Sequence, residues 1–178
     1  MTEATLNARG IRYDRNWMFV DENGKFLSQR EHPHMALIRP KIERNALILN
    51  APKMTELKIS LEQTGPRRNV IVWRSACEAI DQGDGVADWI NDFLGFKARL
   101  VRIANDFMRP VNPQFARRPK DQVGFADAFP FLLISQASLD DLNCRLKEKL
   151  PDESLPSQCG RQRLPSLHRG YVGPDSCG

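Results

Sequence analysis

Two short segments combine residue types that could bind an anionic ligand. Residues 13–17 read Tyr-Asp-Arg-Asn-Trp, and the guanidinium of Arg15 could present its planar fork to a phosphate. Residues 120–130 contain Gly124 and small alanines around Asp127, so the backbone could closely approach a ligand there. Each segment also has a simpler interpretation. The first could be an Asp–Arg pair that orients the entrance to a strand, and the second an Asp-capped turn before a buried strand.

The histidines, cysteines and carboxylates do not predict a metal centre or a nucleophile. His32 and His34 flank a proline with no third ligand at a useful spacing, so we expect surface-loop histidines. The four cysteines form no CxxC pair and are expected to be free thiols, and Cys144 has no histidine near it in sequence. The four aspartates at residues 81–92 lack the alternation of a calcium loop and are expected on the solvated face of a helix.

Composition places the chain among ordinary globular proteins. It has 178 residues, 41% of them apolar and 27% charged, which suits about one domain and excludes collagen and low-complexity classes. No apolar run approaches the roughly 20 residues that cross a bilayer, and residues 1–9 lack a signal-peptide pattern, so we expect a cytoplasmic protein without a membrane partner. The net charge of +4 and the absence of a basic tract argue against a nucleic-acid partner.

Short apolar runs separated by turn residues dominate the first two thirds of the chain and predict strands. Residues 17–30 predict a hairpin, because the Asn23-Gly24 pair tolerates the positive φ angles of a tight turn. The spacing of the runs is typical of a barrel or sandwich. Further runs with strand character lie at residues 35–38, 46–49, 57–61, 69–73 and 98–103.

Two segments show helical spacing instead. Residues 85–94 place apolar side chains on one face and are followed by Gly95, a typical C-terminal cap. A second helix is predicted to start at Ser138, with leucines repeating at helical intervals as far as Leu150. Residues 151–178 are rich in Gly, Pro and Ser, have no periodicity and are predicted to be disordered.

Taken together, these segments resemble the MOSC family. Gly-Ile-Arg-Tyr-Asp-Arg-Asn-Trp-Met-Phe-Val-Asp at 10–21 and Phe-Leu-Ser-Gln-Arg-Glu at 26–31 are similar to the opening of its N-terminal β-barrel domain. Further similarity to that domain lies at residues 35–38, 88–95 and 99–102, and similarity to the start of the MOSC domain lies at 118–122, 125–127, 130–135 and 137–143. The resemblance implies a mixed α/β, predominantly β fold. It would comprise a β-barrel-like MOSC N-terminal domain at 1–116, without its first strand, and a partial second MOSC barrel at 117–150.

The resemblance also implies a function. MOSC proteins of this kind bind the molybdenum cofactor, a pterin whose metal takes a Cys thiolate. They reduce small N-hydroxylated compounds with electrons from an iron–sulfur or other reductase partner. Arg15 matches the family's cofactor-contacting arginine, and Ala126, Asp127, Ala128 and Phe129 match the segment that approaches the pterin. Because three of these four side chains carry no polar group, contacts from them would come from the backbone. A non-enzymatic substrate- or partner-binding module is the alternative.

The chain departs from the family pattern at both ends. Three features of the family have no match: the Lys-Ser strand expected before residue 3, the Arg-Phe-Arg-Pro-Asn motif expected after the second helix, and the metal-ligating Cys. Codons permitted by residues 151–163, read one nucleotide later, encode Asn-Arg-Phe-Arg-Pro-Asn. We therefore hypothesise that residues 151–178 are an out-of-frame tail and that the chain is truncated, inactive alone and unable to retain the cofactor. A gene sequence lacking those codons would refute the frameshift.

Overall fold

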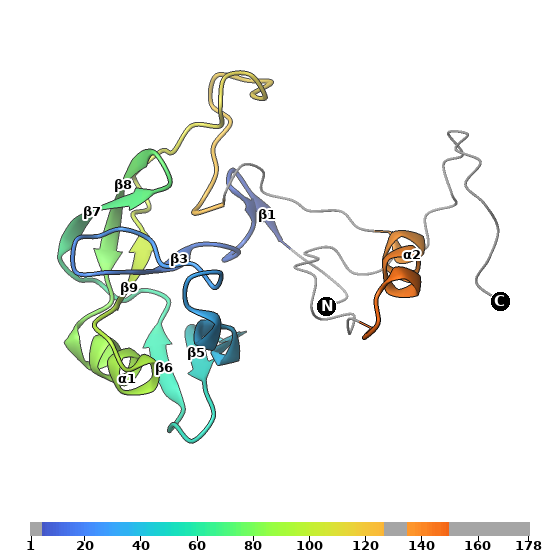
Figure 1. Cartoon of the computed structure of the whole chain (residues 1–178). Coiled ribbons are helices and arrows are strands. Elements are labelled where there is room, and N and C mark those ends of the chain that lie inside the picture. The colour runs from blue at the N-terminus through green and yellow to red at the C-terminus, as the bar shows by residue number, and fades with distance from the viewer. Residues whose placement is uncertain (1–4, 127–134, 150–178) are drawn as a thin grey trace.

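The computed structural model describes residues 5–126 and 135–149 (Figure 1). The described part is mostly β structure with few helices, in agreement with the predicted predominantly β fold. Its strands form a two-stranded, a three-stranded and a four-stranded sheet, and no closed barrel is formed by the strands of these ranges. The two-stranded sheet pairs β1 (Leu6–Asn7) with β2 (Gly10–Ile11).

The four-stranded sheet is antiparallel throughout and has the order β3-β9-β8-β7. Three of its strands were predicted, but β8 was not, because Ser-Ala-Cys-Glu-Ala-Ile-Asp buries small and polar residues in place of an apolar alternation. The strands are β3 (Trp17–Val20), β7 (Arg67–Val72), β8 (Ser75–Asp81) and β9 (Arg99–Ile103).

The predicted hairpin forms its turn but only part of its return strand. Gly24 has φ +78°, and its N–H donates to Asp21 O at 3.1 Å. Phe26 then bridges Val20 of β3 while Lys25 bridges Ile71 of β7, so this short segment lies between the two end strands of the sheet. The segment therefore shields both sheet edges without becoming a regular strand.

The three-stranded sheet joins β4 (Arg39–Glu43), β5 (Ala46–Asn50) and β6 (Leu57–Ser60) in sequence order. The strands predicted near 46–49 and 57–61 are confirmed. The apolar run 35–38 is different, because it lies largely in a 3₁₀ helix, η1 (Pro33–Leu37), that buries Met35. Pro33, the first residue of η1, has a fixed φ angle that suits a helical turn.

Helix α1 (Asp84–Leu94) confirms the first predicted helix. It ends at Gly95, whose φ of +78° is the left-handed conformation that glycine adopts readily. Val86, Ile90 and Leu94 pack into a core shared with the three-stranded sheet, and Ile90 is fully buried. Figure 1 shows α1 beside β9 and β6. A second core lies on the four-stranded sheet and consists of Val20, Val70, Val72, Cys77, Ala79, Val101, Ile103 and Phe125.

Helix α2 (Gln136–Arg145) starts two residues before the predicted Ser138. Ser135 is its cap, because its Oγ accepts from the Ser138 N–H at 3.1 Å. The leucines were predicted to repeat at helical spacing as far as Leu150, but the helix ends at Arg145, and Leu142 and Leu146 are 36% and 38% exposed. No helix in residues 5–126 or 135–149 is long and apolar enough to span a membrane. The predicted tail at 151–178 lies outside the described residues, and the domain boundaries stay predictions.

Candidate functional site

Arg15 lies in a strained turn between β2 and β3. Tyr13 has φ +70° and Arg15 has φ +49°, a left-handed conformation that is uncommon for residues other than glycine. The turn is held from both sides, since the Asp14 N–H donates to Ile11 O at 3.0 Å and the Ile103 N–H donates to Asn16 O at 2.9 Å. The backbone therefore fixes the point from which the Arg15 side chain projects.

The Arg15 side chain makes the ion pair that the simpler interpretation predicts. Its Nη1 lies 3.2 Å from Asp14 Oδ2, and the two side chains are 31% and 29% exposed. Burial raises the pKa of the Asp14 carboxyl, and the neighbouring Arg15 charge offsets part of that shift. The pair and a ligand-binding role are compatible, because a guanidinium has five N–H donors.

The segment 123–126 lies directly beside this turn, although more than 100 residues separate the two in sequence. The Phe125 N–H donates to Arg15 O at 2.8 Å. A Cβ on Gly124 would lie 2.8 Å from the same oxygen, so only glycine permits this approach without a shift. The structure thus brings Arg15 and the buried Ala126 into one region. The other three predicted residues, Asp127, Ala128 and Phe129, lie outside the described residues.

Sequence reasoning missed Arg109, which contacts the same segment from inside the protein. It is 7% exposed, and its Nη1 donates to Gly124 O at 2.8 Å and to Ala126 O at 2.7 Å. Its own carbonyl accepts from the Val123 N–H at 3.0 Å. No periodic pattern surrounds Arg109 in the sequence, so only the tertiary contact reveals its role.

Two further arginines make this region basic. Arg9 donates to Gln122 Oε1 at 3.3 Å and to the Phe107 carbonyl at 2.6 Å. Burial lowers the pKa of Arg9, as does the nearby positive charge of Arg102, whose own pKa burial lowers. The Nε of Arg102 is buried and has no hydrogen-bond partner within the described part of the chain. Residues 122–126 thus contact three arginines, Arg9, Arg15 and Arg109. Of these three, Arg15 makes a described ion pair, with Asp14.

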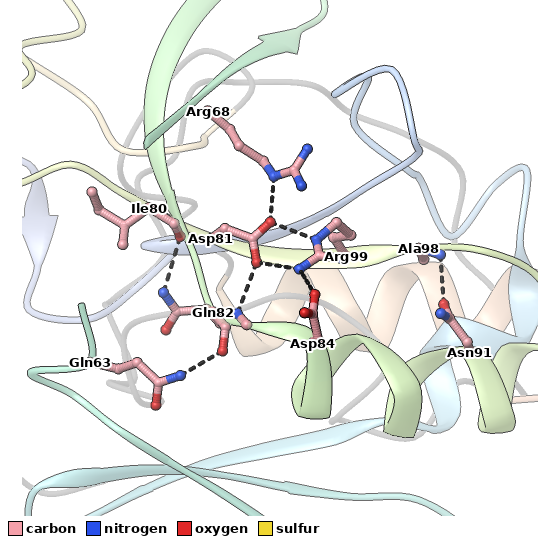
Figure 2. A network of polar contacts seen from close by, with 10 residues as sticks. Gln63, Arg68, Ile80, Asp81, Gln82, Asp84, Asn91, Ala98 and Arg99 are labelled. Carbon is pink, nitrogen blue, oxygen red and sulfur yellow. Dashed lines mark hydrogen bonds and ion pairs between the residues drawn. The ribbon is translucent and has the colours of Figure 1, made fainter. Parts of the chain in front are cut away.

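A second polar network ties the four-stranded sheet to α1 (Figure 2). Asp81 is 1% exposed and accepts from Arg99 Nε at 2.6 Å, Arg99 Nη2 at 2.9 Å, the Gly83 N–H at 2.8 Å and Arg68 Nε. Arg99 also reaches Asp84 on α1 at 2.7 Å. Burial alone would raise the pKa of Asp81, but the bonds from Arg99 and Gly83 and the Arg99 charge outweigh it and lower that pKa.

This network corrects the prediction that Asp81 lies with the other aspartates on a solvated helix face. Asp81 ends β8 and is buried, whereas Asp84 belongs to α1 and is exposed. Both carboxylate oxygens of Asp81 are fully engaged by the protein's own donors. The network is therefore structural and leaves no oxygen of Asp81 for a ligand.

The remaining candidates support no metal centre. His32 packs on Phe96 and His34 on Phe93, with ring centroids 4.5 and 4.6 Å apart. Burial raises the pKa of the Cys77 thiol, and Cys144 is exposed on α2. Residues 5–126 and 135–149 contain no group of three or more His, Cys, Asp or Glu that could hold a metal ion.

Comparison with known proteins identifies the family. The MOSC N-terminal beta barrel domain matches residues 1–97. Mitochondrial amidoxime-reducing component 1 of Mus musculus is 34% identical over 84% of this chain and 47% of its own length. Molybdenum cofactor sulfurase 3 of Aedes aegypti is 33% identical over 96% of this chain and 22% of its own length. The chain thus spans about half the length of the amidoxime-reducing relatives.

A solution structure of a Bordetella bronchiseptica protein has 22% identity and a TM-score of 0.47, covering 60% of this chain and 92% of that one. With the domain match extending over more than half of its residues, the chain belongs to the MOSC N-terminal beta barrel domain family.

Proposed function

We propose that this chain supplies part of the molybdenum-cofactor site of an oxidoreductase that reduces small N-hydroxylated compounds. The observation that carries the proposal is the contact between the fixed Arg15 turn and the segment 124–126. It joins an arginine to a closely packed backbone, the combination that holds a phosphate-bearing group. The names of the relatives support the cofactor class, since one reduces amidoximes and another is a molybdenum cofactor sulfurase.

The described residues suit the phosphate end of a pterin. Arg15 would donate to the phosphate from a partly exposed side chain, and Ala126 and the residues that follow it (Asp127, Ala128 and Phe129) would contribute backbone groups. The surrounding arginines would favour the anion further. When bound, the cofactor would supply two-electron, oxygen-removing chemistry. Its electrons would come from an iron–sulfur or other reductase partner in the cytoplasm.

The metal end of the cofactor is not matched within the described residues. The two cysteines there, Cys77 and Cys144, lie in a buried strand and on an exposed helix, away from any cluster of potential ligands. We therefore propose that this chain binds the pterin weakly and does not retain the metal. Metal analysis of the chain purified from a cofactor-producing host tests this, and molybdenum near one equivalent would contradict it.

The binding test uses hydroxymethylpterin phosphate as the probe and its fluorescence as the signal. The full chain is compared with Arg15→Met and with the control Arg39→Met, which removes an exposed arginine from β4. A hydrogen bond to a charged group contributes about 1.5–3 kcal/mol, so Arg15→Met should weaken binding about tenfold or more. Equal affinities in all three proteins would refute the role of Arg15.

An outcome without pterin binding has its own interpretation. If no variant binds the probe but a protein partner or an N-hydroxylated substrate raises the melting temperature, the chain is a non-enzymatic binding module. The amount of the shift at a known ligand concentration then gives the affinity.

A further inference from the structure

We propose that Arg109 is a positioning residue that holds the backbone leading into the candidate cofactor residues. The functional consequence rests on the function proposed above, whereas the structural role does not. Arg109 belongs to the loop after β9, which Figure 1 shows in yellow to orange extending away from the sheets. Arg109 is not itself assigned to the ligand, and it contacts the carbonyls of Gly124 and Ala126, so a positioning effect on binding would pass through the segment 124–126.

Arg109 and Arg15 hold this segment from different sides and through different groups. Arg109 Nη1 donates hydrogen bonds to the carbonyl oxygens of Gly124 and Ala126, at 2.8 and 2.7 Å. The N–H of the intervening Phe125 donates to Arg15 O at 2.8 Å. Residues 124 and 125 form a bend, and one Nη1 atom reaches the carbonyls on both sides of Phe125. The two carbonyls and the Phe125 N–H are therefore anchored to different partners, which together fix the bend.

The chemistry of the contact suits an arginine. Both bonds come from the two N–H groups of Nη1, whose directions the planar guanidinium fixes, whereas an ammonium is a flexible point charge. Within the described residues Arg109 forms no ion pair, and its two short bonds go to carbonyl oxygens. A buried cation compensated by carbonyls alone is costly, which favours keeping both carbonyls in place.

The position of this segment also determines the strained turn. If residues 124–126 move, Arg15 O loses its donor and the left-handed conformation of Arg15 loses a stabilising contact. Arg109 is therefore coupled to Arg15 although no hydrogen bond joins their side chains. Removing Arg109 should therefore weaken the hydrogen bond from the Phe125 N–H to Arg15 O and, with it, shift Arg15.

The first test measures amide hydrogen exchange at Phe125 in the full chain, without any ligand. Both Arg109→Met and Arg109→Lys should raise the exchange rate about tenfold or more, while the amides of β5 stay protected. The control is Arg9→Met, which removes a partly buried arginine that contacts Gln122 but not residues 124–126, and it should leave Phe125 near the wild-type rate. Unchanged exchange in the Arg109 variants would overturn the proposal.

Arg109→Lys is also the variant to use if Arg109→Met does not fold, because it keeps the buried positive charge. With hydroxymethylpterin phosphate as the probe, it should bind about tenfold more weakly than the wild type. Wild-type affinity in Arg109→Lys would overturn positioning and assign the effect to charge.

The two proposals fail in different ways. If the wild type does not bind the probe, the proposed function fails, and faster Phe125 exchange in the Arg109 variants still supports positioning. If the wild type binds and exchange is unaltered, positioning alone fails.

Discussion

Replacing Asp81 with Asn tests whether the buried network in Figure 2 holds the four-stranded sheet together. The substitution keeps the size of the side chain but removes its charge. One carboxylate oxygen becomes an NH₂ group that faces N–H donors of Arg99 or Arg68. The variant therefore loses an acceptor and places donors against donors in a buried position.

The expected loss of unfolding free energy depends on how exposed Arg99 and Arg68, the partners of Asp81, are to water. Removing one member of a buried ion pair costs about 3–5 kcal/mol, because the remaining charge is left uncompensated. Arg99 and Arg68 are 23% and 40% exposed, so water can partly rehydrate them and the lower end, about 3 kcal/mol, is expected. At roughly 2–4 °C per kcal/mol for a chain of this size, the melting temperature should fall by about 6–12 °C.

Thermal and urea unfolding at neutral pH measure this loss. Asp88→Asn is the matched control, since Asp88 is exposed on α1 and makes no ion pair within the described residues. Its unfolding free energy should change by less than about 0.5 kcal/mol. If Asp81→Asn loses less than about 1 kcal/mol, the network does not stabilise the sheet and the reasoning is refuted.

The unfolding free energy measured as a function of pH should also reveal the contribution of Asp81. The pKa of Asp81 is lower in the folded state than its ordinary 3.8, so its contribution is present above about pH 4 and is lost as the pH falls through the folded value. The difference in unfolding free energy between the wild type and Asp81→Asn should therefore stay constant from pH 7 to about 4 and become smaller at lower pH. Ile90→Ala, which empties a fully buried position on α1, should cost about 3 kcal/mol in urea unfolding, and a loss under 1 kcal/mol would place Ile90 outside the core. Gly24→Ala and Gly95→Ala share a φ of +78°, but a Cβ meets Asn69 O at 2.7 Å in the first and nothing within 4 Å in the second. Gly95→Ala should cost about 1 kcal/mol and Gly24→Ala at least about 1 kcal/mol more, and equal losses would show that the contact with Asn69 relaxes freely.

Local patterns predicted the elements that rest on local chemistry. Helix α1 was predicted nearly residue for residue because its apolar face and Gly95 are signals contained in one stretch of chain. The Asn23-Gly24 turn was predicted for the same reason. The return strand after it was not predicted correctly, because its length depends on β7, which lies over 40 residues away in the sequence.

Strand β8 was missed because its buried side chains are small or polar. Its inward positions are Cys77, Ala79 and Asp81, and the last is stabilised by arginines from β7 and β9. In a sequence, an aspartate at such a position favours a solvated surface, because the arginines that pair with it are distant along the chain and cannot be recognised. The same limitation applies to Arg109, whose burial depends on carbonyls 15 and 17 residues further along the chain.

The candidate site is a tertiary feature, and the strained turn shows why. A left-handed conformation costs a non-glycine residue about 1–2 kcal/mol, so Tyr13 and Arg15 together store about 2–4 kcal/mol. A relaxed turn would recover that energy but would move Arg15 O away from the Phe125 N–H and open the packing against Gly124. The bond from the Ile103 N–H of β9 and the contact with the segment 124–126 together keep the turn in its conformation, and Arg109 helps to hold that segment. The resemblance could therefore identify Arg15 from its motif, but the direction in which Arg15 points is determined by residues more than 90 positions away.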